Sequence, residues 1–133
     1  MERDFERDLR SLDAITRYVA EFFEAAAISG ENDLYVNLVI EELFTNAVKY
    51  SPEGGDVTIA LTKQDGDLVI RLSDHDVEPF DVTTAPDVDT SLPVKDRRRG
   101  GLGLHLVKKI ARDVTYQYVD RCSVITVKMA LEA

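Results

Sequence analysis

The sequence predicts an α+β fold: a two-layer sandwich in which helices cover one face of a mostly antiparallel mixed sheet. Three observations support this fold class. Apolar residues recur at helical spacing early in the chain, later segments alternate with a period of two, and a further helix and hairpin follow a long irregular segment. The 133 residues suit one domain over residues 1–133, and the hydrophobic content of 44% is sufficient for a core.

Two helices are expected at the start of the chain. Apolar residues at helical spacing extend from about residue 5 to residue 27, after which a Ser-Gly-Glu-Asn stretch interrupts the pattern. A second helix is expected over residues 33–50, and a Ser-Pro-Glu-Gly-Gly stretch ends it. The apolar face of this second helix is expected to consist of Leu34, Leu38, Leu43 and Ala47.

A β-hairpin is expected next, because the apolar period changes to two. Residues 57–61 and 68–72 are typical of strands, and Asp65-Gly66 between them is a strong signal for a tight turn. Residues 74–99 hold prolines and acidic residues without a sustained period. In a compact domain a segment of this kind is more often a functional lid than a simple connection.

The last part of the chain is expected to form a third helix and a second hairpin. The helix is expected over residues 102–112, and the strands over residues 115–119 and 123–129. Helices and hairpins in this order predict that the helices cover one face of the sheet.

Composition and charge disfavour several classes of function. The formal net charge of −9 disfavours general nucleic-acid binding, which needs a basic surface. No apolar run approaches the roughly 18 residues needed to cross a bilayer, and the charged start lacks a secretory apolar segment. The single cysteine, Cys122, excludes an internal disulfide framework. These features predict a soluble cytoplasmic protein with neither a direct nucleic-acid partner nor a membrane.

A glycine-rich stretch, Arg97–Leu104, opens the third expected helix. A turn of this kind presents unpaired backbone N–H groups at the positive end of the helix dipole. Such a site suits a phosphate group, and three arginines adjoin it. The alternative interpretation is a basic loop before a flexible helix start.

The second expected helix carries a carboxylate and an amide four residues apart. This spacing places Glu42 and Asn46 on one helix face, about one turn apart. An asparagine oxygen is a hard ligand that suits Mg²⁺, and a glutamate one turn earlier can accept a proton from an attacking hydroxyl or water. Glu41 competes with Glu42 on the same chemistry, and an isolated pair of this kind is also compatible with a polar stripe on an amphipathic helix.

These motifs and their order resemble the GHKL ATPases, which include gyrase and the histidine kinases. Residues 41–47, Glu-Glu-Leu-Phe-Thr-Asn-Ala, resemble the N-box of that superfamily, and residues 99–104, Arg-Gly-Gly-Leu-Gly-Leu, resemble its G2 box. The short form is similar to the anti-sigma factor serine kinases of the RsbW/SpoIIAB type. The resemblance covers nearly the whole chain and implies the Bergerat fold.

The resemblance implies a nucleotide site with ATP and Mg²⁺ as cofactors. Glu42 is then the general base and Asn46 the Mg²⁺ ligand, while residues 83–98 form a lid. The remaining implied contacts to the ATP phosphates are Arg99, Gly100, Gly101, Leu102, Gly103 and Leu104. The resemblance also implies phosphorylation of a serine on an anti-anti-sigma partner with a STAS domain, sequestration of a sigma factor, and a homodimer.

The middle motif of the family, Asp-x-Gly followed by Pro-Phe-Asp, is altered in this chain. Its tail is present, but its glycine is missing. If Asp74 takes the Asp position, then Asp76 replaces the glycine; without an inserted residue, His75 and Val77 take the two positions. The resemblance implies that the motif aspartate accepts a hydrogen bond from the adenine amino group. We favour Asp74 for that position because it directly follows a strand, with Asp76 as the second candidate.

Two further expectations concern the base pocket. Replacing the glycine is expected to narrow the pocket, so that ATP affinity is low or absent. Thr126, in the last expected strand, is expected to reach the adenine through a water, as a threonine does in relatives.

Two main hypotheses for function follow from these features. The first is an ATP-dependent protein serine/threonine kinase that also binds a sigma factor; the intact Glu42–Asn46 pair and the glycine-rich turn favour it. The second is a pseudo-kinase module that acts by sequestering partners with weak or no ATP binding, which the altered middle motif favours. A split histidine kinase is a weaker third hypothesis, because no phosphoacceptor helix is recognisable.

Overall fold

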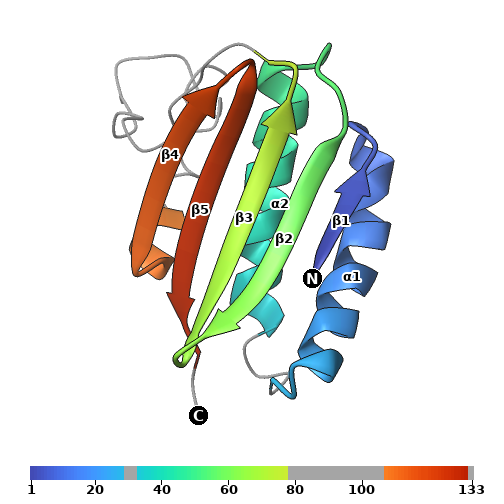
Figure 1. Ribbon diagram of the computed structural model, residues 1–133. Coiled ribbons are helices and arrows are strands. Elements are labelled where there is room, and N and C mark those ends of the chain that lie inside the picture. The colour runs from blue at the N-terminus through green and yellow to red at the C-terminus, as the bar shows by residue number, and fades with distance from the viewer. Residues whose placement is uncertain (29–32, 78–106, 132–133) are drawn as a thin grey trace, which may run out of the picture.

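The computed structural model describes residues 1–28, 33–77 and 107–131, and in these residues two helices cover one face of a five-stranded sheet (Figure 1). The helices are α1 (Leu12–Ala25) and α2 (Asp33–Tyr50). The strands are β1 (Glu2–Phe5), β2 (Val57–Gln64), β3 (Asp67–His75), β4 (Asp113–Val119) and β5 (Cys122–Ala130). Within this part of the chain, no helix is long and apolar enough to cross a membrane.

The sheet has the strand order β1-β2-β3-β5-β4, and every neighbouring pair among the described strands is antiparallel. Both expected hairpins are present. Asp65 and Gly66 link β2 to β3 with φ angles of 50° and 82°, and Asp120 and Arg121 link β4 to β5 with φ angles of 50° and 63°. Two consecutive positive φ values are the mark of the tight turn that matches the twist of a hairpin. The predicted α+β fold is therefore confirmed, and its described strand pairs are entirely antiparallel.

The start of the chain differs from the sequence prediction, which placed one helix from residue 5 to residue 27. Residues 2–5 instead form β1, which pairs with β2 at the sheet edge, and a short 3-10 helix at Leu9–Ser11 precedes α1. The Asp8 side chain accepts a hydrogen bond from the Arg10 backbone N–H and so caps the 3-10 helix. An edge strand with a single buried side chain, that of Phe5, has no alternating apolar pattern from which it could be predicted.

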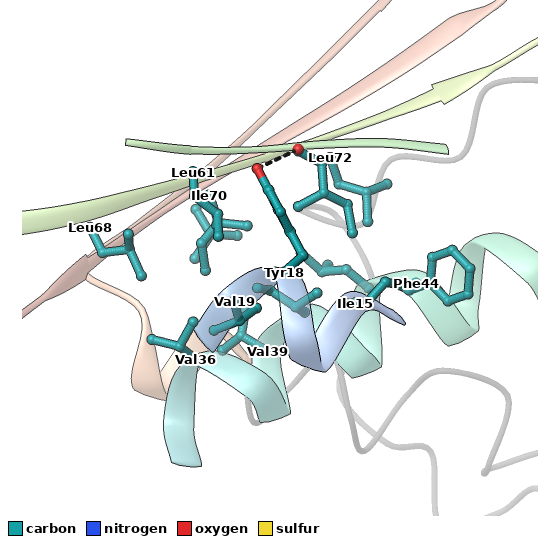
Figure 2. Packing of buried hydrophobic residues seen from close by; sticks show 14 of the residues in the cluster. Ile15, Tyr18, Val19, Val36, Val39, Phe44, Leu61, Leu68, Ile70 and Leu72 are labelled. Carbon is teal, nitrogen blue, oxygen red and sulfur yellow. Dashed lines mark hydrogen bonds between the residues drawn. The ribbon is translucent and has the colours of Figure 1, made fainter. Parts of the chain in front are cut away.

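The core lies between the two helices and the sheet. In Figure 2, apolar side chains of α1 and α2 point toward those of β2 and β3, and the Tyr18 ring stands among them. Of the four residues predicted to form the apolar face of α2, only Leu43 and Ala47 are buried. Leu34 is 73% exposed and Leu38 is 36% exposed. The side chains of α2 that are buried are Val36, Val39, Ile40, Leu43, Phe44, Asn46 and Ala47. The buried face is thus rotated from the expected one along the first half of the helix.

The third expected helix lies mostly outside the described residues. Residues 107–110 are helical, and the Val107 side chain belongs to the core. The chain then enters β4 at Asp113, two residues earlier than the sequence predicts.

Candidate nucleotide site

The α2 helix places Glu42 and Asn46 together, as the sequence predicts. Asn46 is 5% exposed, and its Nδ2 donates to Glu42 Oε1 at 3.3 Å. Glu42 is half-buried whereas Glu41 is exposed, which favours Glu42 of the two competing carboxylates. This bond uses the amide nitrogen of Asn46, so it leaves the amide oxygen for another partner. An amide oxygen beside a carboxylate fits a hard cation such as Mg²⁺, which prefers oxygen ligands.

The alternation along β3 determines which acidic residue faces the helices. Asp74 is in phase with the buried Leu72 and is 7% exposed, so its carboxylate lies on the helix side of the sheet. Asp76 follows the strand, is exposed, and has a φ of 61°. Positive φ is the conformation that glycine adopts most readily. The geometry therefore favours Asp74 as the motif aspartate, with Asp76 in the glycine position.

Asp76 and Val77 contact Arg121, which lies in the turn between β4 and β5. The Asp76 carboxylate forms an ion pair with Arg121, at 3.1 Å from Arg121 Nε to Asp76 Oδ1. The backbone N–H of Val77 donates to the Arg121 carbonyl oxygen at 2.9 Å. His75, an alternative for the Asp position, is exposed, which makes it a weaker candidate than the buried Asp74. These contacts connect the end of β3 to the β4–β5 turn.

Arg7, which carries no motif in the sequence, forms a buried ion pair with Asp74. The exposed fractions of the two side chains are 4% for Arg7 and 10% for Asp74, and Arg7 Nη2 contacts Asp74 Oδ1. Burial raises the pKa of Asp74, because it penalises the charged carboxylate, while the Arg7 guanidinium opposes that rise. The residues are 67 positions apart in the chain, so no local pattern could have indicated the contact.

The register of β5 overturns the expectation that Thr126 approaches the base. Thr126 pairs with Arg71 and is out of phase with the buried residues of the strand, so it lies on the face away from the helices. Ser123 pairs with Asp74, is 5% exposed, and shares the helix-facing side. Directly opposed residues in antiparallel strands point to the same face. Ser123 is therefore the hydroxyl beside Asp74, and the period of two along β5 is the signal that could have found it.

An open pocket of about 410 Å³ lies at this end of the molecule. It is lined by Tyr50, Ser51, Pro52, Glu53, Gly54, Asp76, Val77 and Arg121. These residues come from the end of α2, the loop after it, the end of β3 and the β4–β5 turn. A volume of this order falls in the range of small-molecule sites.

The glycine-rich turn and the expected lid lie outside the described residues. This applies to residues 83–98, Arg99, Gly100, Gly101, Leu102, Gly103 and Leu104. The described site therefore comprises the Glu42–Asn46 pair on α2, Asp74 and the groups around them.

Comparison with known proteins identifies relatives in the same family that the sequence motifs resemble. The family model of the histidine kinase-like ATPase domain matches residues 5–129. Serine-protein kinase RsbW of Listeria monocytogenes is 29% identical over 100 residues, which cover 70% of this chain and 63% of that protein. RsbW of Listeria innocua is 28% identical with the same coverage. The chain thus spans less than two thirds of the length of these curated relatives.

Solved structures share the fold at lower sequence identity. A chain from the crystal structure of the SiaB–SiaC complex of Pseudomonas aeruginosa superposes with a TM-score of 0.67 at 15% identity, covering 98% of this chain and 88% of that one. The histidine kinase AdeS of Acinetobacter baumannii superposes with a TM-score of 0.50 at 15% identity, covering 100% of this chain and 68% of that one. At these identities the likeness concerns the fold alone.

Proposed function

Because the chain belongs to the histidine kinase-like ATPase domain family, we propose that it is an anti-sigma regulator of the RsbW type with ATP-dependent serine kinase activity. It binds Mg-ATP, phosphorylates a serine on a STAS-type partner, sequesters a sigma factor and acts as a homodimer. The similarity to proteins named serine-protein kinase RsbW supports this proposal. We assign Asn46 to the end of the nucleotide site that binds the metal ion, called the metal end, and Asp74 to the end that binds the adenine base, called the base end.

The observation that carries the proposal is the hydrogen-bonded pair on α2 formed by the buried Asn46 amide and the half-buried Glu42 carboxylate. Glu42 accepts the proton of the serine hydroxyl as the serine oxygen bonds to the γ-phosphorus, while the bond from that phosphorus to ADP breaks. The hydrogen bond from Asn46 Nδ2 holds Glu42 Oε1, and the amide oxygen of Asn46 would ligate a bound metal ion. A bound Mg²⁺ offsets negative charge on the β- and γ-phosphate oxygens.

A second candidate function is sequestration of partners without phosphoryl transfer. Two features favour it: the Asp74 carboxylate already has an ionic partner, and the chain lacks the glycine of the family motif, a position that we assign to Asp76. Under this alternative the fold is a binding module, and Mg-ATP has little effect on it.

Titration with Mg-ATP, followed by thermal melting with and without Mg²⁺, separates the two candidates. We expect Mg-ATP to raise the melting temperature, because a ligand that binds only the folded state stabilises it. Asn46→Ala should abolish the rise. Asn37→Ala is the matched control: Asn37 is also on α2, and its amide also contacts the carboxylate four residues earlier, that of Asp33. No rise at millimolar Mg-ATP would favour sequestration.

Phosphoryl transfer to a STAS partner is tested with Glu42→Gln. This variant should retain the Mg-ATP melting shift and lose transfer, because the amide keeps the shape of the carboxylate but cannot accept the proton. Glu41→Gln, on the exposed neighbour, should transfer normally. Equal transfer by the Glu42 variant and the unmodified protein would show that Glu42 is not the base.

A further inference from the structure

Arg7 is anchored between the two ends of the proposed nucleotide site. Its side chain leaves the segment between β1 and the 3-10 helix, and it is 4% exposed. Nε donates to the Gly55 carbonyl oxygen at 3.0 Å, and Nη1 donates to the Ala47 carbonyl oxygen at 3.0 Å. Nη2 contacts Asp74 Oδ1 and lies 3.4 Å from the His75 carbonyl oxygen. One guanidinium thus joins α2, the loop after it, and the end of β3.

The loop after α2 is shaped around this guanidinium. A Cβ atom at Gly54 would lie 2.4 Å from Arg7 Nη2 and 2.6 Å from Arg7 Cζ, which is closer than non-bonded atoms approach. Only glycine therefore leaves the space that Arg7 fills. Besides Asp74, the carbonyl oxygens of Gly55 and Ala47 also hold the guanidinium, through Nε and Nη1.

We propose that Arg7 is a positioning residue of the nucleotide site: it holds Asp74 to accept a hydrogen bond from the base and fixes the distance from Asp74 to the Asn46 end of α2. This inference rests on the proposed function. Ala47, the Nη1 partner, directly follows Asn46 in the helix. Nη1 and Nη2 of one planar group therefore connect the residues assigned to the metal end and the base end.

The state of the Asp74 carboxylate explains why such a residue is needed. Arg7 occupies Oδ1, and among the described residues no donor contacts Oδ2, which leaves an acceptor for an amino group. Burial raises the pKa of Asp74, and the Arg7 guanidinium opposes that rise because it stabilises the charged carboxylate. Among residues 1–28, 33–77 and 107–131, two other titratable groups interact electrostatically with Asp74: His75, which also lowers the pKa of Asp74, and Cys122, whose own pKa Asp74 raises.

The test compares affinities for Mg-ATP and Mg-inosine triphosphate from about pH 5 to about pH 8. Inosine triphosphate carries a carbonyl oxygen in place of the 6-amino group, so a carboxylate acceptor discriminates against it. We expect Arg7→Met to lose most of the preference for ATP over inosine triphosphate. As the pH is lowered, its ATP affinity should fall at a pH roughly one to three units higher than in the unmodified protein, because the Asp74 carboxylate is protonated earlier without Arg7. Arg7→Lys should restore part of both properties because it retains the charge.

A matched control and a second variant keep the test decisive. Arg10→Met is the control, because Arg10 is 91% exposed and pairs with Asp8 away from the site. Gly54→Ala displaces the guanidinium without changing Arg7 or Asp74, and it should shift the pH profile in the same direction. It serves in place of Arg7→Met if melting shows that Arg7→Met does not fold.

The outcomes separate this inference from the proposed function. If the unmodified protein binds no nucleotide, the proposed function fails and this inference fails with it. If it binds Mg-ATP and the variants of Arg7 and Gly54 give the same pH profile and base preference, the inference alone is overturned. Tighter ATP binding by Arg7→Met would also overturn it, because Arg7 would then compete with the base.

Discussion

The two ends of the sheet bury different kinds of side chain. At the end where β2 turns into β3, the buried residues are apolar, as Leu61, Leu68 and Val36 illustrate. At the opposite end, uppermost in Figure 1, α2 finishes, β2 and β5 begin and β3 ends. The buried polar side chains of the described residues gather there: Asn46, Thr58, Asp74 and Ser123.

This asymmetry indicates which end is built for stability and which for binding. Burying a polar group costs free energy unless it is fully hydrogen-bonded, and burying a charge costs more unless it is paired. A fold selected for stability alone would not collect such groups at one end. Local departures from the rules of a well-packed core are expected at functional sites. The comparison predicts that substitutions at the apolar end change the free energy of unfolding but not ligand binding, whereas substitutions at the polar end change ligand binding.

The largest expected effect comes from breaking the buried ion pair. Arg7→Met leaves the Asp74 carboxylate buried without its cation, which should lower the free energy of unfolding by about 3–5 kcal/mol. The measurement is urea denaturation at neutral pH. Adding Asp74→Asn to Arg7→Met removes both charges and should recover much of the loss.

An exposed ion pair provides the control for this prediction. Arg3 pairs with Glu21, and the two side chains are 44% and 54% exposed. Arg3→Met should cost about 1 kcal/mol or less, because water screens an exposed pair. Equal losses for the Arg3 and Arg7 variants would contradict the claim that the polar end contains a buried charge held by its partner.

At the apolar end, Ile70→Ala should lower the free energy of unfolding by about 2–5 kcal/mol, since Ile70 is 0% exposed and its truncation leaves a cavity. The variant should still show the Mg-ATP melting shift, because Ile70 is remote from the polar end along β3. Loss of that shift in a folded Ile70 variant would mean that the two ends are not independent.

Features that depend on local pattern could be predicted from the sequence. Asp65-Gly66 indicated the first hairpin, and both residues adopt the positive φ that this turn requires. The spacing of Glu42 and Asn46 indicated a shared helix face, and the two side chains are hydrogen-bonded. In each case the residues that determine the geometry lie within five positions of one another, so local rules suffice.

Features that depend on long-range packing could not be predicted in this way. Arg7 and Asp74 meet only because β1 pairs with β2 and the chain then turns toward the end of β3. Thr126 was chosen by residue type, although the period along β5 places Ser123 on the helix side. Leu34 fits a helical period but lies where α2 faces away from the core. Which side of an element is buried is decided by its neighbours.

A smaller effect is expected where a polar atom enters the apolar core. The Tyr18 hydroxyl lies 2.7 Å from the Met1 carbonyl oxygen and 2.9 Å from the Ile59 carbonyl oxygen. Figure 2 shows the Tyr18 side chain pointing from α1 toward the sheet. Tyr18→Phe should lower the free energy of unfolding by about 1–3 kcal/mol, because it leaves carbonyl oxygens without this donor. Urea denaturation at neutral pH measures the difference, and no loss would mean that water replaces the hydroxyl.

The same tyrosine makes stability fall at alkaline pH. Burial raises the pKa of Tyr18 to about 12, from the ordinary tyrosine value of 10.0 that applies in the unfolded chain. The folded protein then holds the phenolic proton more tightly, so its stabilisation is complete below pH 10 and is lost as the pH rises toward 12. The difference in stability between Tyr18→Phe and the unmodified protein should therefore shrink above pH 10. A constant difference would contradict the raised pKa.

The smallest change in stability is expected at the residue whose loss most affects binding. Asn46 is 5% exposed, and its only side-chain hydrogen bond among the described residues is the 3.3 Å bond to Glu42. Asn46→Leu replaces a buried amide with an apolar side chain of similar volume, so the free energy of unfolding should change by less than about 1 kcal/mol or increase. The same variant should lose the Mg-ATP melting shift, because leucine offers no oxygen to a cation. A loss of several kcal/mol without nucleotide would instead make Asn46, like the Arg7–Asp74 pair, part of the structural framework of the polar end.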